Sequence, residues 1–217
     1  MLSLHTERLL RDVLVEVMEG ELGSENLRQI LCGSNPDFSP YSAFMRIDRT
    51  AEEHLNGGNV LQFLRDNHVM QFTQGDCQKL INFYDSDQNG FLSYQDFLQM
   101  VLPCEDLALR LETSNRPFFR VSRFETLPIT MEVALTNVVQ QELRVLKQLE
   151  KLTYDMERRP DYSALSVYRC IDRLNEGRID SINLERFFKE NGLYLQEREL
   201  HALIRRIDTT ADQTVSY

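Results

Sequence analysis

The feature that most constrains this chain is an internal duplication. The segment PDFSPYSAFMRID, from Pro36 to Asp48, resembles PDYSALSVYRCID, from Pro160 to Asp172, and 124 residues separate the two. The same offset relates NVLQFLRDN, which ends at Asn67, to NLERFFKEN, which ends at Asn191. One residue then drops out, because DSDQNGFLSY and DTTADQTVSY are 123 residues apart. Self-similarity of this kind predicts that each half of the chain folds into the same pair of units.

Each unit reads as a helix, an acidic loop and a second helix. In LINFYDSDQNGFLSYQDFLQMV, apolar side chains at helical spacing lie on both sides of the loop. The sequence therefore predicts an all-α fold made of two lobes, with one pair of units in each. The eighth residue of each loop is apolar, which predicts short strands that couple the loops of a pair. The expected couples are Leu55 with Leu92 and Ile179 with Val215.

A further amphipathic helix is predicted before each pair. Residues from about Thr130 to Glu157 place apolar side chains at alternating spacings of three and four, interrupted by Glu142. The first half carries a corresponding stripe, made of Leu10, Val13 or Leu14, and Val17 or Met18. We expect each of these helices to close the core of its own lobe. A coiled-coil or partner-binding surface is the alternative.

The expected domain boundaries follow from the prolines. Residues 1–102 are predicted to form the N-terminal helix and the first pair, residues 103–129 a connector, and residues 130–217 the long helix and the second pair. The connector contains three prolines, which stop helices, and the segment NRPFFRVSRF, where arginine and phenylalanine alternate. We expect this segment to dock on its own domain, because its aromatic residues are too dense for a free linker. Docking on an acidic partner, a phosphate or a membrane surface is the alternative.

One loop carries a complete set of oxygen donors. The loop from Asp85 to Asp96 has oxygen-bearing side chains at positions one, three, five, nine and twelve, and Gly90 at position six, where the chain must turn sharply. This pattern resembles the calcium-binding loop of the EF-hand, or calmodulin, superfamily. The resemblance extends from about Asp37 to Tyr217, apart from the connector, and implies four EF-hand units in two pairs. The metal ligands that it implies are Asp85, Asp87, Asn89, the carbonyl of Phe91, Ser93 and Asp96.

The expected ion is Ca²⁺, a hard cation that takes six to eight oxygen ligands. Asp96 departs from the glutamate that the family usually has at position twelve. Aspartate is one methylene shorter and reaches less well around the ion with both of its oxygens. We therefore expect a dissociation constant of about 10⁻⁶ M or weaker, or a shift of preference toward the smaller Mg²⁺.

Two of the other loops lack essential ligands. In DRTAEEHLNGGN, Glu53 replaces the glycine at position six and Asn59 replaces the carboxylate at position twelve. In DRLNEGRIDSIN, Leu174 replaces the ligand at position three and Asn183 ends the loop. We expect both loops to be structural and to hold no metal.

The fourth loop, DTTADQTVSY, is incomplete in this sequence. Oxygen-bearing residues occupy its first ligand positions, but Gln213 replaces the glycine, and the sequence ends at position ten. We expect this loop not to bind an ion firmly. The missing exit helix should leave apolar surface in the second lobe, which favours self-association. The ligand positions that are filled are Asp208, Thr210, Asp212 and Ser216.

The composition and the motifs of the chain argue against nucleic-acid binding, secretion, membrane insertion and catalysis. The formal net charge of −10 disfavours a nucleic-acid partner, because binding to phosphates depends on clustered lysine and arginine. The first 22 residues carry charges inside an apolar stretch, so we expect neither a secretory signal nor a membrane span. The four histidines are scattered, and none belongs to a nucleophile or metal motif, so we do not expect an enzyme.

Two functions remain in competition. The first is a protein-binding adaptor, which three disabled loops out of four favour. The predicted architecture is similar to that of multi-hand proteins in cytoskeletal or ciliary assemblies. This similarity implies a cytoplasmic location, associated with the cytoskeleton or the cilium, and a helical protein partner. The alternative is a calcium sensor that opens an apolar groove for a target helix. The residues expected to line that groove are Phe63, Phe83, Phe97 and Met100.

Overall fold

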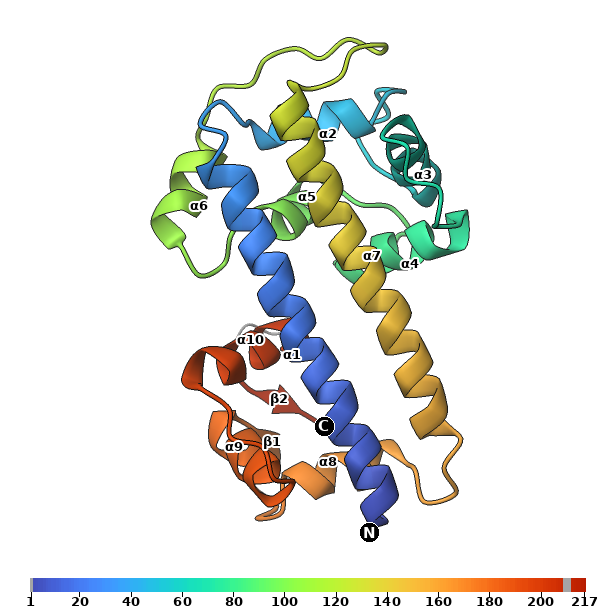
Figure 1. Cartoon of the computed structure of the whole chain (residues 1–217), viewed down its shortest axis with the longest axis vertical. Coiled ribbons are helices and arrows are strands. Elements are labelled where there is room, and N and C mark those ends of the chain that lie inside the picture. The colour runs from blue at the N-terminus through green and yellow to red at the C-terminus, as the bar shows by residue number, and fades with distance from the viewer. Residues whose placement is uncertain (1, 209–211) are drawn as a thin grey trace. The chain divides into compact units, whose positions relative to one another are not determined.

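The computed structural model describes residues 2–208 and 212–217. These residues form ten α-helices and one two-stranded antiparallel ribbon, which confirms the predicted all-α class (Figure 1). None of the described helices is long and apolar enough to cross a membrane. The helices are α1 (Leu4–Gly33), α2 (Pro40–Ile47), α3 (Gly57–Asp66), α4 (Gln74–Tyr84), α5 (Tyr94–Val101), α6 (Leu107–Ser114), α7 (Ile129–Glu157), α8 (Ala164–Ile171), α9 (Ser181–Glu190) and α10 (Glu197–Ile207), and the strands are β1 (Arg178–Ile179) and β2 (Val215–Ser216).

The helix boundaries repeat the duplication of the sequence. Helices α8 and α9 begin and end 124 residues after α2 and α3, and α10 begins and ends 123 residues after α4. The long helices α1 and α7 precede the two pairs, as the apolar stripes predicted. The loss of one residue between the segments thus falls in the connection before α10, where it shifts the next helix without changing its length.

The eighth residues of the loops couple the units in pairs, as predicted. The backbone N–H of Leu55 donates to the carbonyl of Leu92 at 2.9 Å, and Leu92 returns the bond at 2.8 Å. In the second half, Ile179 of β1 pairs with Val215 of β2. Each coupling ties the two loops of a pair together.

The compact units divide the chain at different places from the expected boundaries. One unit, here called the first-pair unit, comprises Gly23–Leu146. The other, here called the second-pair unit, comprises Met1–Leu22 and Lys147–Tyr217. Helices α1 and α7 each contribute one part to each unit, since α1 is divided after Leu22 and α7 after Leu146. The break therefore falls within the two long helices and not at the proline-containing connector.

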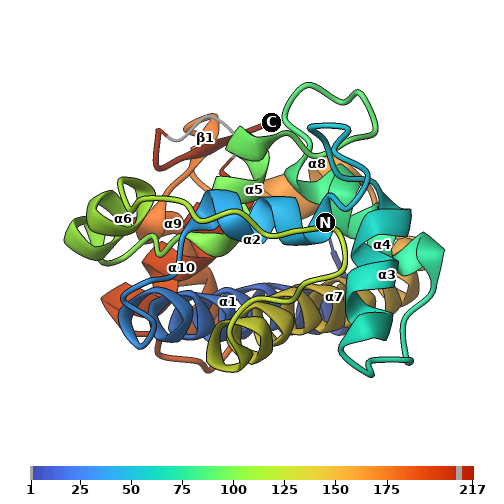
Figure 2. The same ribbon diagram turned by 90° about the horizontal axis from the view of Figure 1, so that it is seen from above.

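The core of the first-pair unit contains the first half of α7. Helices α3 and α4 lie side by side (Figure 2), and their apolar faces share one cluster with α2 and α5. The second half of α1 adds Leu31 to this cluster. The residues that α7 and its preceding turn add are Leu127, Met131, Leu135, Val138, Val139 and Leu143.

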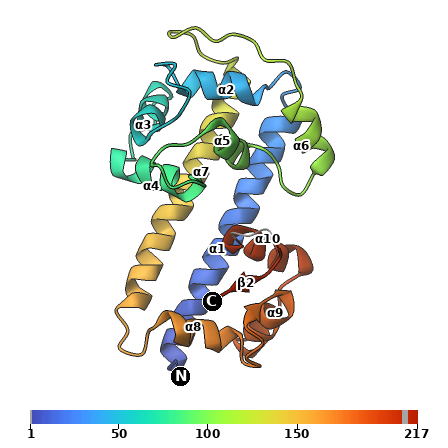
Figure 3. The same ribbon diagram turned by 180° about the vertical axis from the view of Figure 1, so that it is seen from behind.

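The core of the second-pair unit contains the first half of α1. Figure 3 shows α8, α9, β2 and α10 gathered beside this part of α1, whose stripe packs on Phe187, Phe188 and Leu203. The expectation that the N-terminal helix closes the core of the first pair was therefore wrong for this stripe. An apolar stripe indicates that one face of a helix is buried, but it does not indicate which partner covers that face. The stripe consists of Leu10, Val13, Leu14, Val17 and Met18.

The expected connector contains a helix that its prolines did not predict. Helix α6 begins after Asp106, whose carboxylate accepts the N–H of Leu109 at 2.9 Å. Pro103 precedes this helix and Pro117 follows it, so the prolines limit the helix without interrupting it. The region 103–129 is thus not an unstructured linker, and it belongs to the first-pair unit.

The basic and aromatic segment docks on its own unit at two points, as expected. The Arg116 guanidinium donates to the carbonyls of Cys32 at 2.9 Å and Asn35 at 3.0 Å. Ser42 and Phe119 exchange two hydrogen bonds, of 2.7 and 2.9 Å. These hydrogen bonds satisfy backbone groups of Cys32, Asn35 and Phe119. They therefore hold the segment on its unit, although the segment forms neither a helix nor a strand. The side chains of Phe118 and Phe124 remain exposed.

Candidate metal-binding loop

The loop from Asp85 to Asp96 lies between two helices that fix both of its ends. Asp85 is the C-terminal cap of α4, and its N–H donates to the carbonyl of Ile81 at 2.9 Å. Ser93 is the N-terminal cap of α5, and Asp96 lies in the first turn of that helix. The bridge between Leu55 and Leu92 holds the middle of the loop. The predicted ligands thus alternate along a segment whose backbone is restrained at three points.

The carboxylate of Asp85 organises the turn of the loop. It accepts the backbone N–H of Gly90 at 2.7 Å and that of Asn89 at 3.3 Å. Gly90 has a φ of +86°, a left-handed conformation that favours glycine. Burial of Asp85 raises its pKa, but these N–H donors and the Asp87 side chain outweigh burial and lower the pKa below its usual value. Asp85 is therefore an ionised oxygen donor at neutral pH.

The other three loops share this backbone arrangement. In each, the first aspartate accepts the N–H of the sixth residue: Asp48 from Glu53 at 2.8 Å, Asp172 from Gly177 at 2.9 Å, and Asp208 from Gln213 at 2.7 Å. The sixth residue has a positive φ in all three, including 62° at Glu53 and 64° at Gln213. The absence of glycine in two loops thus did not change the conformation of the sixth residue. Of the ligand positions in the fourth loop, Thr210 lies outside the described residues.

Asp87 and Asn89 contact each other within the loop. The Asn89 amide nitrogen donates to an oxygen of Asp87 at 2.9 Å, and the Asn89 amide oxygen accepts the N–H of Phe91 at 2.8 Å. The ring of Phe91 packs edge-on against His54 of the first loop, with 4.3 Å between the ring centroids. Positions three and five are therefore side by side, with their oxygens already engaged by donors of the loop.

Asp96 is engaged at the start of α5. One of its oxygens accepts the N–H of Ser93 at 3.1 Å and the Ser93 hydroxyl at 2.6 Å. Burial of Asp96 raises its pKa, but hydrogen bonds from Ser93 and Ser86 outweigh burial and lower the pKa. The two Ser93 bonds that cap the helix use one carboxylate oxygen, so a cation in the loop would be bound through the other.

The donor set suits a hard cation, although the carboxylates are not drawn together. Three carboxylates, an amide oxygen, a hydroxyl and a carbonyl supply six oxygens, the kind of ligand that Ca²⁺ and Mg²⁺ prefer. Asp85, Asp87 and Asp96 do not place three oxygens within 4.8 Å of one another. A bound cation would therefore have to turn side chains inward, while the backbone of the loop already has the required turn.

The two asparagines at position twelve are used as helix caps. The Asn59 side-chain oxygen accepts the N–H of Asn56 at 2.8 Å, and that of Asn183 accepts the N–H of Asp180 at 3.0 Å. An amide has one oxygen acceptor, whereas a carboxylate has two. The cap thus uses the side chain that would otherwise face an ion, which supports the prediction that these loops serve a structural role.

Sequence reasoning missed a buried arginine that contacts both helices beside the candidate loop. Arg28 of α1 donates to the Tyr84 hydroxyl at 3.1 Å and to the carbonyl of Met100 at 3.0 Å. It also forms an ion pair with Glu142 of α7 at 3.0 Å. Glu142, which interrupts the apolar stripe of α7, was the signal that a buried cation must lie opposite it.

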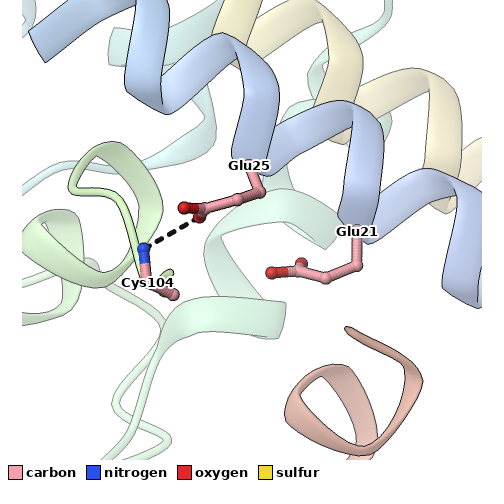
Figure 4. A group of neighbouring side chains, drawn as sticks. All are labelled: Glu21, Glu25 and Cys104. Atoms are coloured by element: carbon pink, nitrogen blue, oxygen red, sulfur yellow. Dashed lines mark hydrogen bonds between the residues drawn. The ribbon is translucent and has the colours of Figure 1, made fainter. Parts of the chain in front are cut away.

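A second group of acidic side chains was not predicted either. Figure 4 shows the Glu25 carboxylate at the backbone nitrogen of Cys104, which donates to it at 2.8 Å. Glu25 also accepts the N–H of Glu105 at 2.9 Å. Glu21, one turn earlier on α1, forms ion pairs with Arg205 and Arg206 of the second-pair unit. Each carboxylate thus anchors its own unit.

Comparison with known proteins identifies no relative: no model of a protein family matches the chain, and no curated protein matches it.

Proposed function

We propose that this chain is an EF-hand-type protein that binds one Ca²⁺, or Mg²⁺, in the loop from Asp85 to Asp96. The proposal rests on four loops in which the first aspartate accepts the N–H of a sixth residue with positive φ, and of which one carries the full set of oxygen donors. The ligands are those predicted, with Asp96 contributing its oxygen that does not cap α5. Replacement of glutamate by aspartate at this position keeps the affinity for Ca²⁺ at the weak end of the range of known sensors.

We further propose that the protein acts as an adaptor and not as a sensor. Three of the four residues expected to line a target groove, Phe63, Phe97 and Met100, are buried in the first-pair unit. They belong to the same cluster as Leu135 and Val138 of α7. An amphipathic helix in this position has the role that a target helix has in a sensor. Because the chain supplies that helix itself, ion binding has no empty groove to expose.

The partner of the adaptor is proposed to be a helical protein within a larger cytoskeletal or ciliary assembly. The exposed side chains of Leu107 and Leu111 lie four residues apart on α6, on one face of that helix. An apolar pair of this kind suits a neighbouring helix. The assembly itself is inferred from the general architecture of duplicated helix and loop units.

Calcium binding is tested by titration calorimetry in millimolar magnesium. The wild-type chain should bind one Ca²⁺, and Asp85→Asn should abolish the heat of binding. Asp172→Asn is the matched control, because Asp172 accepts the same backbone N–H groups in the third loop, which lacks the ligands at positions three and twelve. Asp172→Asn should therefore retain the site. Equal heats in wild type and Asp85→Asn would refute the assignment of the ion to this loop.

The adaptor role is tested with a hydrophobic dye at saturating Ca²⁺. A chain whose groove is already filled should show the same dye fluorescence with and without the ion. A calcium-dependent rise in fluorescence that Asp85→Asn removes would support the sensor function instead.

A further inference from the structure

A single buried side chain joins the two helices that flank the candidate loop. Arg28, which is 2% exposed, donates through Nε to the carbonyl of Met100 and through Nη2 to the hydroxyl of Tyr84. Tyr84 is the last residue of α4, directly before Asp85, and Met100 lies in the last turn of α5. The carbonyls in the last turn of a helix have no hydrogen-bond partner within the helix and lie at the negative end of its dipole. A cation there is therefore stabilised both by hydrogen bonds and by the dipole.

The position of this guanidinium is fixed from its other side. Nη2 of Arg28 lies 3.0 Å from an oxygen of Glu142, and Nη1 lies 3.7 Å from an oxygen of Glu25. Both carboxylates are fully buried. A buried arginine that left this place would leave buried negative charges without their cation, which is strongly unfavourable. Arg28 is therefore held where it contacts both α4 and α5.

The geometry of arginine makes these contacts sensitive to the angle between the helices. The guanidinium is planar and its N–H groups point in fixed directions. In known calcium sensors, ion binding changes the angle between the two helices of a hand. Such a rotation would move the Tyr84 hydroxyl away from the Met100 carbonyl, so that one rigid group could not bond both.

We propose that Arg28 is a positioning residue that keeps α4 and α5 at a fixed angle while the loop between them binds its ion. The inference rests on the proposed function, since it requires a cation in the loop from Asp85 to Asp96. Arg28, with Glu142 behind it, makes the hand a closed one: the ion orders the loop and the apolar face stays covered. Removal of the contact to either helix converts the same hand into one that opens when the ion binds.

The chain contains a matched control for this device. Arg46 and Glu132 form a second buried ion pair in the first-pair unit, at 2.6 Å, which joins α2 to α7. The Arg46 guanidinium lies over the ring of Phe63 in α3, at 5.2 Å from its centroid. This pair therefore contacts the helices of the first loop and leaves α4 and α5 untouched by its guanidinium.

The experiment compares two variants with two controls. Tyr84→Phe removes only the hydroxyl that accepts from Arg28, and Arg28→Met/Glu142→Leu replaces the ion pair by apolar side chains of similar size. Glu25 keeps its N–H donors in the double variant. The controls are Tyr41→Phe, whose ring packs on Tyr94 and Phe118, and Arg46→Met/Glu132→Leu. Each protein is titrated with CaCl₂ by calorimetry, and the fluorescence of a hydrophobic dye is recorded with and without Ca²⁺.

Tyr84→Phe and the double variant Arg28→Met/Glu142→Leu should both bind Ca²⁺ and show a calcium-dependent rise in dye fluorescence. A lost hydrogen bond to a charged group shifts the equilibrium between closed and open forms about tenfold. Wild type and controls should bind Ca²⁺ with no such rise. If all the proteins bind Ca²⁺ and none of them responds to the dye, the role of Arg28 is refuted while the proposed function stands. If wild type binds no Ca²⁺, the proposed function fails and this inference fails with it. Tyr84→Phe preserves the test if the double variant does not fold.

Discussion

The substitution Leu135→Ala tests whether α7 fills the apolar face of the first-pair unit. Leu135 is 0% exposed and lies in the same cluster as Phe97 and Met100. Alanine removes three carbon atoms, which costs about 2.4 kcal/mol at about 0.8 kcal/mol for each buried carbon group. The cavity left behind adds to this cost, so we expect a loss of about 3 kcal/mol in the free energy of unfolding of this unit.

The matched control for Leu135→Ala is Val133→Ala. Val133 lies on the same helix and is 52% exposed, so its truncation should change the free energy of unfolding by at most about 0.5 kcal/mol. Urea unfolding followed by far-ultraviolet circular dichroism measures both, since the chain has no tryptophan for fluorescence. If Leu135→Ala were no more destabilising than Val133→Ala, α7 would not fill this face, and the argument against a sensor would lose its basis.

Further perturbations test the loops, the buried ion pair and the acid stability. Gly90→Ala places a side chain at a φ of +86° and should lower the free energy of unfolding in urea by about 1 kcal/mol. Glu53→Gly should raise it by up to about 1 kcal/mol, because glycine relieves the same strain in the first loop. Equal effects of the two substitutions would contradict this reasoning. Glu142→Gln should cost about 3 kcal/mol, because it leaves Arg28 a buried charge with a weaker partner; a cost under about 1 kcal/mol would refute it. The Ser3 N–H and the Thr6 hydroxyl lower the pKa of Asp161, so the stability that its ionised form adds is present above pH ~4 and is lost as the pH falls below that value. Asp161→Asn should therefore flatten the fall in melting temperature between pH 6 and pH 3, and an unchanged fall would contradict the assignment.

The local structure could be predicted from the sequence because short segments contain their own signals. The duplication predicted the matching helices, and the apolar eighth residues predicted the couplings of Leu55 with Leu92 and of Ile179 with Val215. The candidate loop was found from the spacing of its oxygen donors. These features depend on residues that are close together in the sequence or repeat at a fixed distance.

The long-range organisation could not be predicted in the same way. The stripe that contains Leu14 shows that one face of α1 is buried, but its period is the same whichever core covers it. Helix α6 escaped prediction because the prolines around it were read as breaks throughout the region. Arg28 had no local signal, and only Glu142, a charge inside an apolar stripe 114 residues away, indicated its existence.

The hydrogen bonds of Asp96 could not be predicted from the sequence either. Its place in the sequence predicts a ligand at position twelve, whereas the structure shows it hydrogen-bonded to Ser93 at the start of α5. The asparagines Asn59 and Asn183 form the same cap in the loops without a full ligand set. Position twelve thus caps a helix in all three loops, and a carboxylate is needed there only for the proposed binding of an ion.

The most direct test of the central claim is amide hydrogen exchange in residues 129–146 of α7, measured without Ca²⁺ and at saturating Ca²⁺. The account predicts that these amides are protected in both states, because this part of α7 remains on the apolar face of the first-pair unit while the loop from Asp85 to Asp96 binds the ion. A loss of protection in α7 when Ca²⁺ binds would contradict the account and would identify the protein as a sensor that releases its own helix.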